Sequence, residues 1–307
     1  MRAGGFSSRL TTFYIAAALP LCCGGFVAQR HVTANSTFDA GILRVERFGN
    51  PAAQSIVFIP ALFCGSWEWN AQINTLSSRY DILVVTLPGF DGRPMIAGDD
   101  LMNRAAQSLH LLLTTHDLNR PIVVGHSLGG TIAVYYAAHF PHDLTSVITV
   151  EGGYPAAPTQ ALRDAKVAKS VALYQGISRS EVGEVIRNQA LQYEITNKAD
   201  VDAVAPLAAR SDPNAIAQWI RAALSLDLTP ELHNITVPLT VIIPFDSAFD
   251  PYQGFQTEAA KRHAYDRWAA NAPNATVILV APSRHFVMFD RPKEFEAALE
   301  AALVRSH

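Results

Sequence analysis

From residue 55 to residue 150 the chain alternates short apolar runs with longer segments in which apolar residues recur every three or four positions. Such apolar runs are typical of strands buried in a sheet, and the longer segments are typical of helices packed on it. The predicted strands cover residues 55–60, 81–86, 121–125 and 144–150, after one or two strands in residues 37–48, and the predicted helices cover residues 66–79, 99–116 and 131–140. This order predicts an α/β fold, with a mostly parallel central sheet and helices on both faces.

The alternation stops after residue 150 and resumes near residue 239. Between residues 155 and 237 the pattern predicts helices, including one over residues 180–194 and one that opens at Asp212-Pro213, and it predicts no strand. The sheet pattern then returns with strands at residues 239–244 and 276–282 and helices at residues 256–271 and 292–305. We expect residues 155–237 to form a helical cap insertion over the C-terminal edge of the sheet, where ligands bind in open α/β sheets.

The first 28 residues differ in kind from the rest. Arg2 and Arg9 precede an apolar stretch over residues 13–23, and Gly24-Gly25 follows, which is the order of a secretory signal. We interpret residues 1–28 as a signal peptide and residues 29–307 as the folded domain, so we expect a periplasmic or secreted protein without a stable membrane span. An uncleaved N-terminal membrane anchor is the alternative.

The composition of the chain limits the classes of binding partner that we expect. The chain has 307 residues, 49% of them hydrophobic, a formal net charge of -3, and no basic run with interleaved aromatic residues. These features argue against nucleic-acid binding and favour a protein that acts on small molecules, and they give no indication of oligomeric state. Beyond the predicted leader only Cys64 remains, so we expect no intramolecular disulfide and no zinc site.

The run Gly125-His126-Ser127-Leu128-Gly129 lies between a predicted strand and a predicted helix. A strand that turns abruptly into a helix strains the residue at its apex and leaves no space for side chains two positions away on either side. Ser127 therefore has the place of an exposed nucleophile at a helix N-terminus.

A serine hydroxyl needs a base to take its proton and a carboxylate to orient that base. His285 follows the last predicted strand at the same sheet edge, so we expect it to be the base. Asp246 follows the strand at residues 239–244 and is the expected acid, with Asp250 on the same loop as the alternative. We expect His126 to serve packing or support, because neighbouring side chains at a tight turn point apart.

Acyl transfer also requires two backbone N–H groups that stabilise the developing negative charge. We expect one from Leu128 and the other from Leu62, in the loop after the strand at residues 55–60. Phe63 and Trp67 lie close to that loop and are predicted to line the substrate pocket. Glu151, at the end of the strand at residues 144–150, is a further candidate pocket residue.

These residues together resemble the alpha/beta-hydrolase superfamily, in particular its small capped, esterase-like serine hydrolases. The resemblance rests on Gly125-His126-Ser127-Leu128-Gly129-Gly130, on Leu87-Pro88-Gly89-Phe90, on Asp246 and on Ser283-Arg284-His285-Phe286. It covers the chain from about residue 37 to its end. It implies a Ser-Asp-His triad, an acyl-enzyme intermediate, no cofactor and a helical cap that selects the substrate. We also expect no metal site.

Two departures from the family pattern bear on the site. Pro60-Ala61 stands where the family often has His-Gly, and Pro244-Phe245-Asp246 stands where it usually has a glycine before the acid. The first leaves the role of Leu62 less firmly indicated than that of Leu128, and the second leaves Asp250 open as the acid.

The sequence therefore favours a serine hydrolase that cleaves a carboxylic ester or lactone of a small molecule. An aminopeptidase-like enzyme or a C–C bond hydrolase with the same triad is the first alternative. A non-catalytic ligand-binding protein on a hydrolase scaffold is the second, because a fold does not fix a function. The motifs do not specify the acyl or alcohol group.

Overall fold

The computed structural model describes residues 32–306, so the predicted signal peptide lies outside the described residues. Eight strands form one sheet in the order β1-β2-β4-β3-β5-β6-β7-β8. Their bounds are β1 Ser36–Ala40, β2 Leu43–Gly49, β3 Ser55–Ile59, β4 Asp81–Thr86, β5 Ile122–His126, β6 Ser146–Val150, β7 Leu239–Pro244 and β8 Ala275–Val280. Within residues 32–306 only β2 pairs antiparallel with its neighbours, β1 and β4, so the sheet is mostly parallel, as predicted.

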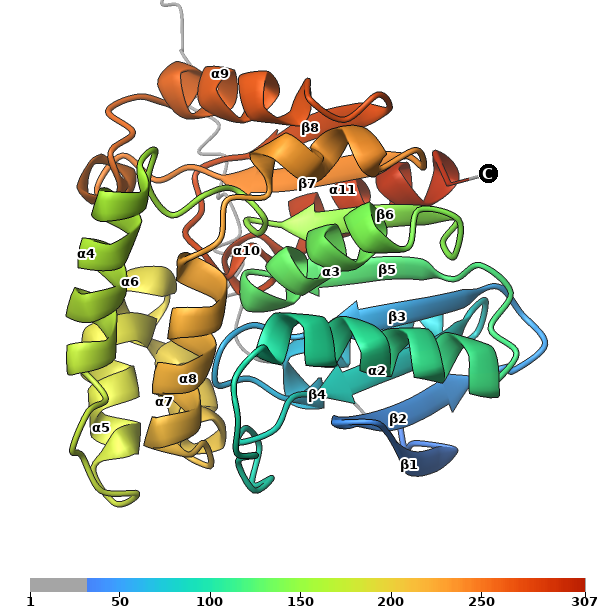
Figure 1. Cartoon of the computed structure of the whole chain (residues 1–307), viewed down its shortest axis with the longest axis horizontal. Coiled ribbons are helices and arrows are strands. Elements are labelled where there is room, and N and C mark those ends of the chain that lie inside the picture. The colour runs from blue at the N-terminus through green and yellow to red at the C-terminus, as the bar shows by residue number, and fades with distance from the viewer. Residues whose placement is uncertain (1–31, 307) are drawn as a thin grey trace, which may run out of the picture.

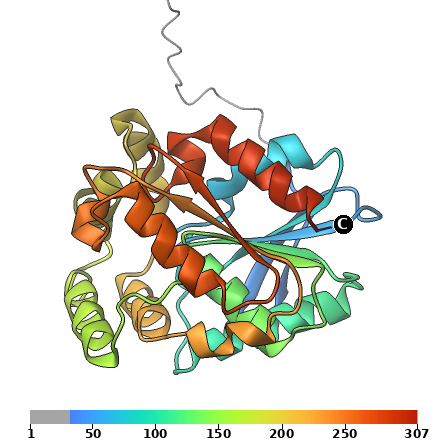
Figure 2. The same ribbon diagram turned by 90° about the horizontal axis from the view of Figure 1, so that it is seen from above.

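Helices cover both faces of this sheet. One face carries α1 and α11, and the other carries α2, α3 and α9 (Figure 2). Their bounds are α1 Asn70–Leu76, α2 Leu101–Thr115, α3 Leu128–His139, α9 Glu258–Ala269 and α11 Pro292–Val304, with the short α10 at Val287–Asp290. The strands β3 to β7 are buried at every position, which explains why they appear in the sequence as continuous apolar runs.

The chain between β6 and β7 contains helices and, throughout this fully described stretch, no strand. Its elements are α4 Gln160–Ala172, α5 Val182–Ile186, the π-helical turn η2 Arg187–Leu191, α6 Gln192–Glu194, α7 Lys198–Ala208, α8 Pro213–Leu224 and the 3-10 turn η3 Thr229–Asn234. We refer to α4 through α8 as the helical insertion. It lies beyond the C-terminal ends of the parallel strands, beside the main sheet (Figure 1).

Three predicted helices differ in detail from the structure. The helix expected over residues 66–79 is a 3-10 turn, η1 Ser66–Trp69, followed by α1, because Glu68 turns inward and accepts the Ala61 N–H. The helix expected from residue 131 begins at Leu128, because glycines in its first turn let it approach the sheet. The helix expected over residues 180–194 is interrupted by η2.

No helix within residues 32–306 has both the length and the apolar character needed to cross a membrane.

Candidate active site

Ser127 occupies the sharp turn between β5 and α3 with φ 52° and ψ −113°, a strained conformation for a residue with a side chain. The neighbouring glycines make this turn possible by close backbone approach. A Cβ on Gly125 would lie 2.2 Å from the Gly129 carbonyl oxygen, and a Cβ on Gly129 would lie 2.0 Å from that of Ile59. The local geometry is therefore that of a nucleophile elbow, as the sequence predicts.

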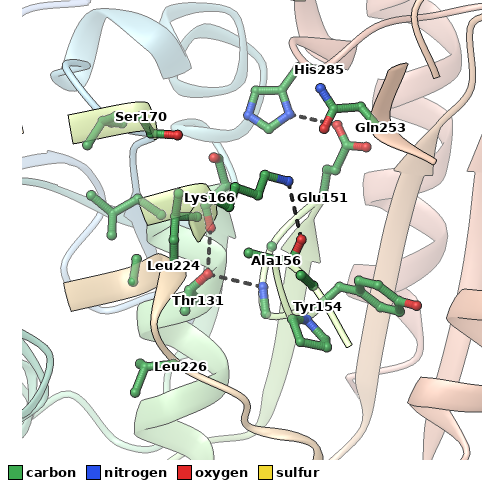
Figure 3. A pocket seen from close by; sticks show the side chains of 18 of the residues that line it. Thr131, Glu151, Tyr154, Ala156, Lys166, Ser170, Leu224, Leu226, Gln253 and His285 are labelled. Carbon is green, nitrogen blue, oxygen red and sulfur yellow. Dashed lines mark hydrogen bonds and ion pairs between the residues drawn. The ribbon is translucent and has the colours of Figure 1, made fainter. Parts of the chain in front are cut away.

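A cavity of about 1040 Å³ lies between the sheet edge and the helical insertion. Ser127 and His285 line it from the sheet side, and Lys166 and Glu194 line it from the insertion. Figure 3 shows His285 and Lys166 among the residues around this cavity. The structure thus brings the predicted nucleophile and the predicted base into the lining of one cavity. A cavity of this size accommodates a small molecule.

The carboxylate that contacts His285 is Glu151. His285 Nδ1 lies 2.6 Å from Glu151 Oε2, across a gap of 134 positions in the chain. Glu151 directly follows β6 and has φ 43°, so a second residue of this site occupies strained backbone. Its N–H donates to the Ile242 carbonyl of the neighbouring β7, which anchors the strained residue to the sheet.

The expected contact between Asp246 and His285 is therefore corrected. Asp246 accepts the Ala248 N–H at 3.0 Å and lies 3.7 Å from Arg284, so it closes the turn after β7. Asp250 is buried, and its Oδ2 accepts the Asp246 N–H at 2.7 Å. Neither aspartate reaches His285, because each is held by the loop on which it lies.

Lys261 on α9 connects Glu151 with Asp250. Its Nζ lies 2.5 Å from Glu151 Oε1 and 2.6 Å from Asp250 Oδ1, and only 2% of its side chain is exposed. Asp250, Lys261, Glu151 and His285 thus form a continuous chain of paired groups. Sequence reasoning did not find Lys261, because a single lysine in a helix of mixed composition carries no signal of burial.

The charges in this series of paired groups shift the pKa values of both Glu151 and His285. Burial would raise the pKa of Glu151, but Lys261 and the hydrogen bond from His285 lower it to about 2. Burial would lower the pKa of His285, but the hydrogen bond and negative charge of Glu151 outweigh it and raise that pKa. Glu151 is therefore ionised at neutral pH and suited to stabilise a protonated His285.

The predicted oxyanion donors line the same cavity. The N–H groups of Leu62 and Leu128 make no hydrogen bond to another residue in the described part of the chain. The adjacent Ala61 N–H is instead directed away, to Glu68 Oε2 at 2.8 Å. Leu62 and Leu128 thus line the cavity that Ser127 also lines, and their N–H groups have no partner among the described residues, as the prediction of two oxyanion donors requires.

Glu68 also connects this loop to the elbow. Its other oxygen bonds to Nδ1 of His126, and Nε2 of His126 donates to the carbonyl oxygen of His285 at 3.0 Å. Glu68 and His126 are both buried. His126 therefore supports the His285 loop, in keeping with the supporting role expected for it, and Glu68 is a residue that sequence reasoning missed.

The structure places two of the three predicted pocket residues at the cavity and the third elsewhere. Phe63 and Glu151 line the cavity. Trp67 does not: it lies at a smaller surface hollow with Asp91 and Arg210, because the η1 turn directs it to the opposite side of the loop. The assignment of Trp67 to the substrate pocket is therefore corrected.

On the insertion side, the charged groups of the cavity have few partners. Lys166 on α4 donates to the Ala156 carbonyl oxygen at 3.3 Å, and the Glu194 carboxyl on α6 has no hydrogen bond or ion pair within residues 32–306. Burial raises the pKa of Glu194, although His285 and His126 partly offset this effect. The described residues contain no cluster of three or more histidine, cysteine, aspartate or glutamate side chains arranged to hold a metal ion.

Comparison with known proteins extends this picture. A model of a family described as "Alpha/beta hydrolase family" matches residues 56–298. A 2-succinyl-6-hydroxy-2,4-cyclohexadiene-1-carboxylate synthase of Serratia proteamaculans is 30% identical over 198 residues, which are 62% of this chain and 76% of that protein.

Two solved structures have the same fold. The enol-lactonase of Burkholderia xenovorans superposes with a TM-score of 0.69 and 20% identity, covering 88% of this chain and 98% of its own. A hydrolase of Pseudomonas aeruginosa superposes with a TM-score of 0.71 and 19% identity, covering 88% of this chain and 99% of its own.

Proposed function

The chain belongs to the alpha/beta hydrolase family, and from this premise we propose that it is a serine hydrolase that cleaves a carboxylic ester or lactone of a small molecule. One observation carries the proposal: a strained Ser127 shares a cavity with a His285 that is already paired with an ionised carboxylate. A base so oriented is what an otherwise unreactive serine hydroxyl needs.

In the proposed reaction His285 Nε2 takes the Ser127 proton while Oγ attacks the substrate carbonyl carbon. The N–H groups of Leu62 and Leu128 stabilise the negative charge on the tetrahedral intermediate. The intermediate collapses, His285 returns the proton to the leaving alkoxide, and an acyl group remains on Ser127. A water molecule, deprotonated by His285, then releases the acid and restores the free serine.

In this proposal Glu151 takes the part that the sequence suggested for Asp246. It holds the His285 Nδ1–H and stabilises the positive charge that forms on the imidazole in each half of the reaction. The enol-lactonase of Burkholderia xenovorans, whose fold this chain shares, is by its name an enzyme of lactones, which supports an ester or lactone substrate.

A panel of small 4-nitrophenyl esters and lactones tests the proposal. We expect turnover by the wild-type protein and loss of turnover in Ser127→Ala. Ser78→Ala, at an exposed serine outside the cavity, is the matched control and should retain full activity. A folded wild-type protein that cleaves no member of the panel would favour the ligand-binding alternative.

One observation favours a second candidate, an aminopeptidase-like enzyme with the same triad. The Glu194 carboxyl lies in the cavity without a partner among the described residues, where it is available to a substrate amine. Aminoacyl 4-nitroanilides beside the esters decide between the two. Faster cleavage of the anilides, lost in Glu194→Gln, would establish the aminopeptidase.

We also propose, from the sequence alone, that residues 1–28 direct export. N-terminal sequencing of the protein recovered from the expressing cells tests this. A mature chain that begins after residue 25 to 28 supports cleavage, whereas an intact N-terminus in the membrane fraction supports the anchor.

A further inference from the structure

A lysine of the helical insertion lines the same cavity as the candidate nucleophile. Lys166 lies on α4 and its side chain points into the cavity, toward the segment after β6 (Figure 3). Its ammonium group donates one hydrogen bond, to the Ala156 carbonyl oxygen at 3.3 Å. No described carboxylate forms an ion pair with it, so the Ala156 carbonyl is its one hydrogen-bond acceptor among the described residues.

A second basic residue of the same helix, in contrast, has an acidic partner. Arg163 is buried, and its guanidinium contacts Asp227 Oδ2 at 3.3 Å, the Ala157 carbonyl at 3.0 Å and Gln160 Oε1 at 2.9 Å. The insertion therefore provides acceptors for one cation on α4 and leaves Lys166 without an acidic partner. A partly buried ammonium without a counter-ion is costly unless a ligand supplies the charge.

The carboxylate that acts on Lys166 from the sheet side is already engaged. Burial lowers the pKa of Lys166, and the charge of Glu151 only partly offsets this effect. Glu151 itself contacts Lys261 and His285 through its two oxygens. The other basic side chain that lines the cavity, Arg267, is exposed, so Lys166 is the partly buried cation of the site.

We propose that Lys166 is the anchor of an anion subsite, and that the substrate carries a carboxylate in addition to the bond that is cleaved. The inference rests on the proposed ester or lactone hydrolysis and specifies its substrate class. Lys166 and Ser127 line one cavity, so the carboxylate and the scissile carbonyl belong to one small molecule. Monoesters of dicarboxylic acids and lactones that bear a carboxylate have this form.

Two pairs of esters test the inference and locate the charge. The first pair compares mono(4-nitrophenyl) glutarate, which has a carboxylate in its acyl group, with the neutral 4-nitrophenyl pentanoate. The second pair compares 4-acetoxybenzoate, which has a carboxylate in its leaving group, with the neutral 4-acetoxybenzamide. We expect the wild type to favour the charged member of one pair. In Lys166→Met the charged-to-neutral ratio of kcat/KM should fall roughly 10- to 100-fold, through KM, because a charge-assisted hydrogen bond is lost.

Matched variants separate this role from a structural one. Lys166→Arg retains a cation and should keep most of the preference, and Lys169→Met, at an exposed lysine of the same helix, should keep all of it. Thermal unfolding confirms that each variant folds. A ratio that is unchanged in Lys166→Met, or that is lost in Arg267→Gln instead, would overturn the inference.

A binding measurement tests the anion subsite independently of ester hydrolysis. Monomethyl glutarate is titrated calorimetrically into Ser127→Ala and into Ser127→Ala/Lys166→Met protein. Binding to the first that weakens at least tenfold in the second supports the anion subsite even where no ester is cleaved. Equal affinity for both proteins contradicts the subsite, whatever the ester panel shows.

Discussion

The two walls of the cavity differ in how their charged groups are partnered. On the sheet wall Glu151 contacts both His285 and Lys261, and Lys261 also contacts Asp250. On the insertion wall Lys166 and Glu194 face the cavity without an ionic partner among the described residues. A paired wall is organised before any substrate arrives, whereas an unpaired wall is completed by the substrate.

This difference assigns separate tasks to the two walls. A catalytic constellation is effective when its geometry is fixed by surrounding contacts, and Glu151 and His285 on the sheet wall have such contacts. Groups that select a substrate must instead retain free hydrogen-bonding capacity. Substitutions on the sheet wall should therefore change turnover for all substrates, and substitutions on the insertion wall should change preference among them.

The largest expected effect is at the carboxylate that contacts His285. Glu151→Gln keeps the size of the side chain but removes the charge that stabilises a protonated His285, so kcat/KM for a neutral 4-nitrophenyl ester should fall about a thousandfold to ten-thousandfold. Asp246→Asn, at the carboxylate of the adjacent turn, should remain within about twofold. An equal loss of kcat/KM in Glu151→Gln and Asp246→Asn would show that Asp246 also takes part in catalysis.

The next effect concerns Lys261. Lys261→Met leaves Glu151 and Asp250 as buried carboxylates without their common cation, which should cost about 3–5 kcal/mol of unfolding free energy. Chemical denaturation measures this loss. The double variant Lys261→Met/Asp250→Asn removes one of the two negative charges and should recover part of the stability. A single variant as stable as the wild type would show that the buried ion pairs contribute little.

The pH dependence of the same variant separates its charge from its packing. Hydrolysis requires neutral His285, whose pKa Glu151 raises, so wild-type activity should fall as the pH drops through a value above the usual value of about 6.5. The charge of Lys261 lowers the pKa of His285, so the acidic limb of kcat/KM should move to higher pH in Lys261→Met and in the double variant. An unchanged limb would indicate a role in packing alone.

A smaller effect is expected at the support of the oxyanion loop. Glu68 accepts the Ala61 N–H and bonds to His126, which holds the His285 carbonyl. Glu68→Gln weakens the contacts of Glu68 with Ala61 and His126 but leaves both proposed oxyanion N–H groups in place. We therefore expect kcat to fall about tenfold, which is less than the hundredfold or greater loss typical of a missing oxyanion donor. Steady-state kinetics measure it. Full activity in a correctly folded variant would rule out Glu68 as a positioning residue.

Much of the sheet wall could be predicted from the sequence because its signals are local. The apolar runs of β3 to β7 indicate buried strands, and the glycines around Ser127 indicate a turn with close backbone approach. His285 was found because it follows the last strand of the sheet. Each of these inferences needs only a few adjacent residues.

Local sequence signals could not identify the carboxylate that pairs with His285. Glu151, Asp246 and Asp250 all follow strands at the same sheet edge, and which of them meets His285 depends on side-chain directions set by distant contacts. Lys261, 110 positions from Glu151, holds Asp250 and Glu151 together. The inward turn of Glu68 and the outward direction of Trp67 are likewise set by the η1 turn, which the apolar pattern represents as ordinary helix.

The proposed hydrolysis depends on the transfer of the acyl group to Ser127. The direct test is intact-mass spectrometry, with peptide mapping, of wild-type and Ser127→Ala protein treated with a fluorophosphonate or quenched during turnover of a 4-nitrophenyl ester. We expect one adduct per wild-type chain, located on the peptide that contains Ser127, and no adduct in Ser127→Ala. An adduct on another residue, or turnover that persists in Ser127→Ala, would show that Ser127 is not the nucleophile.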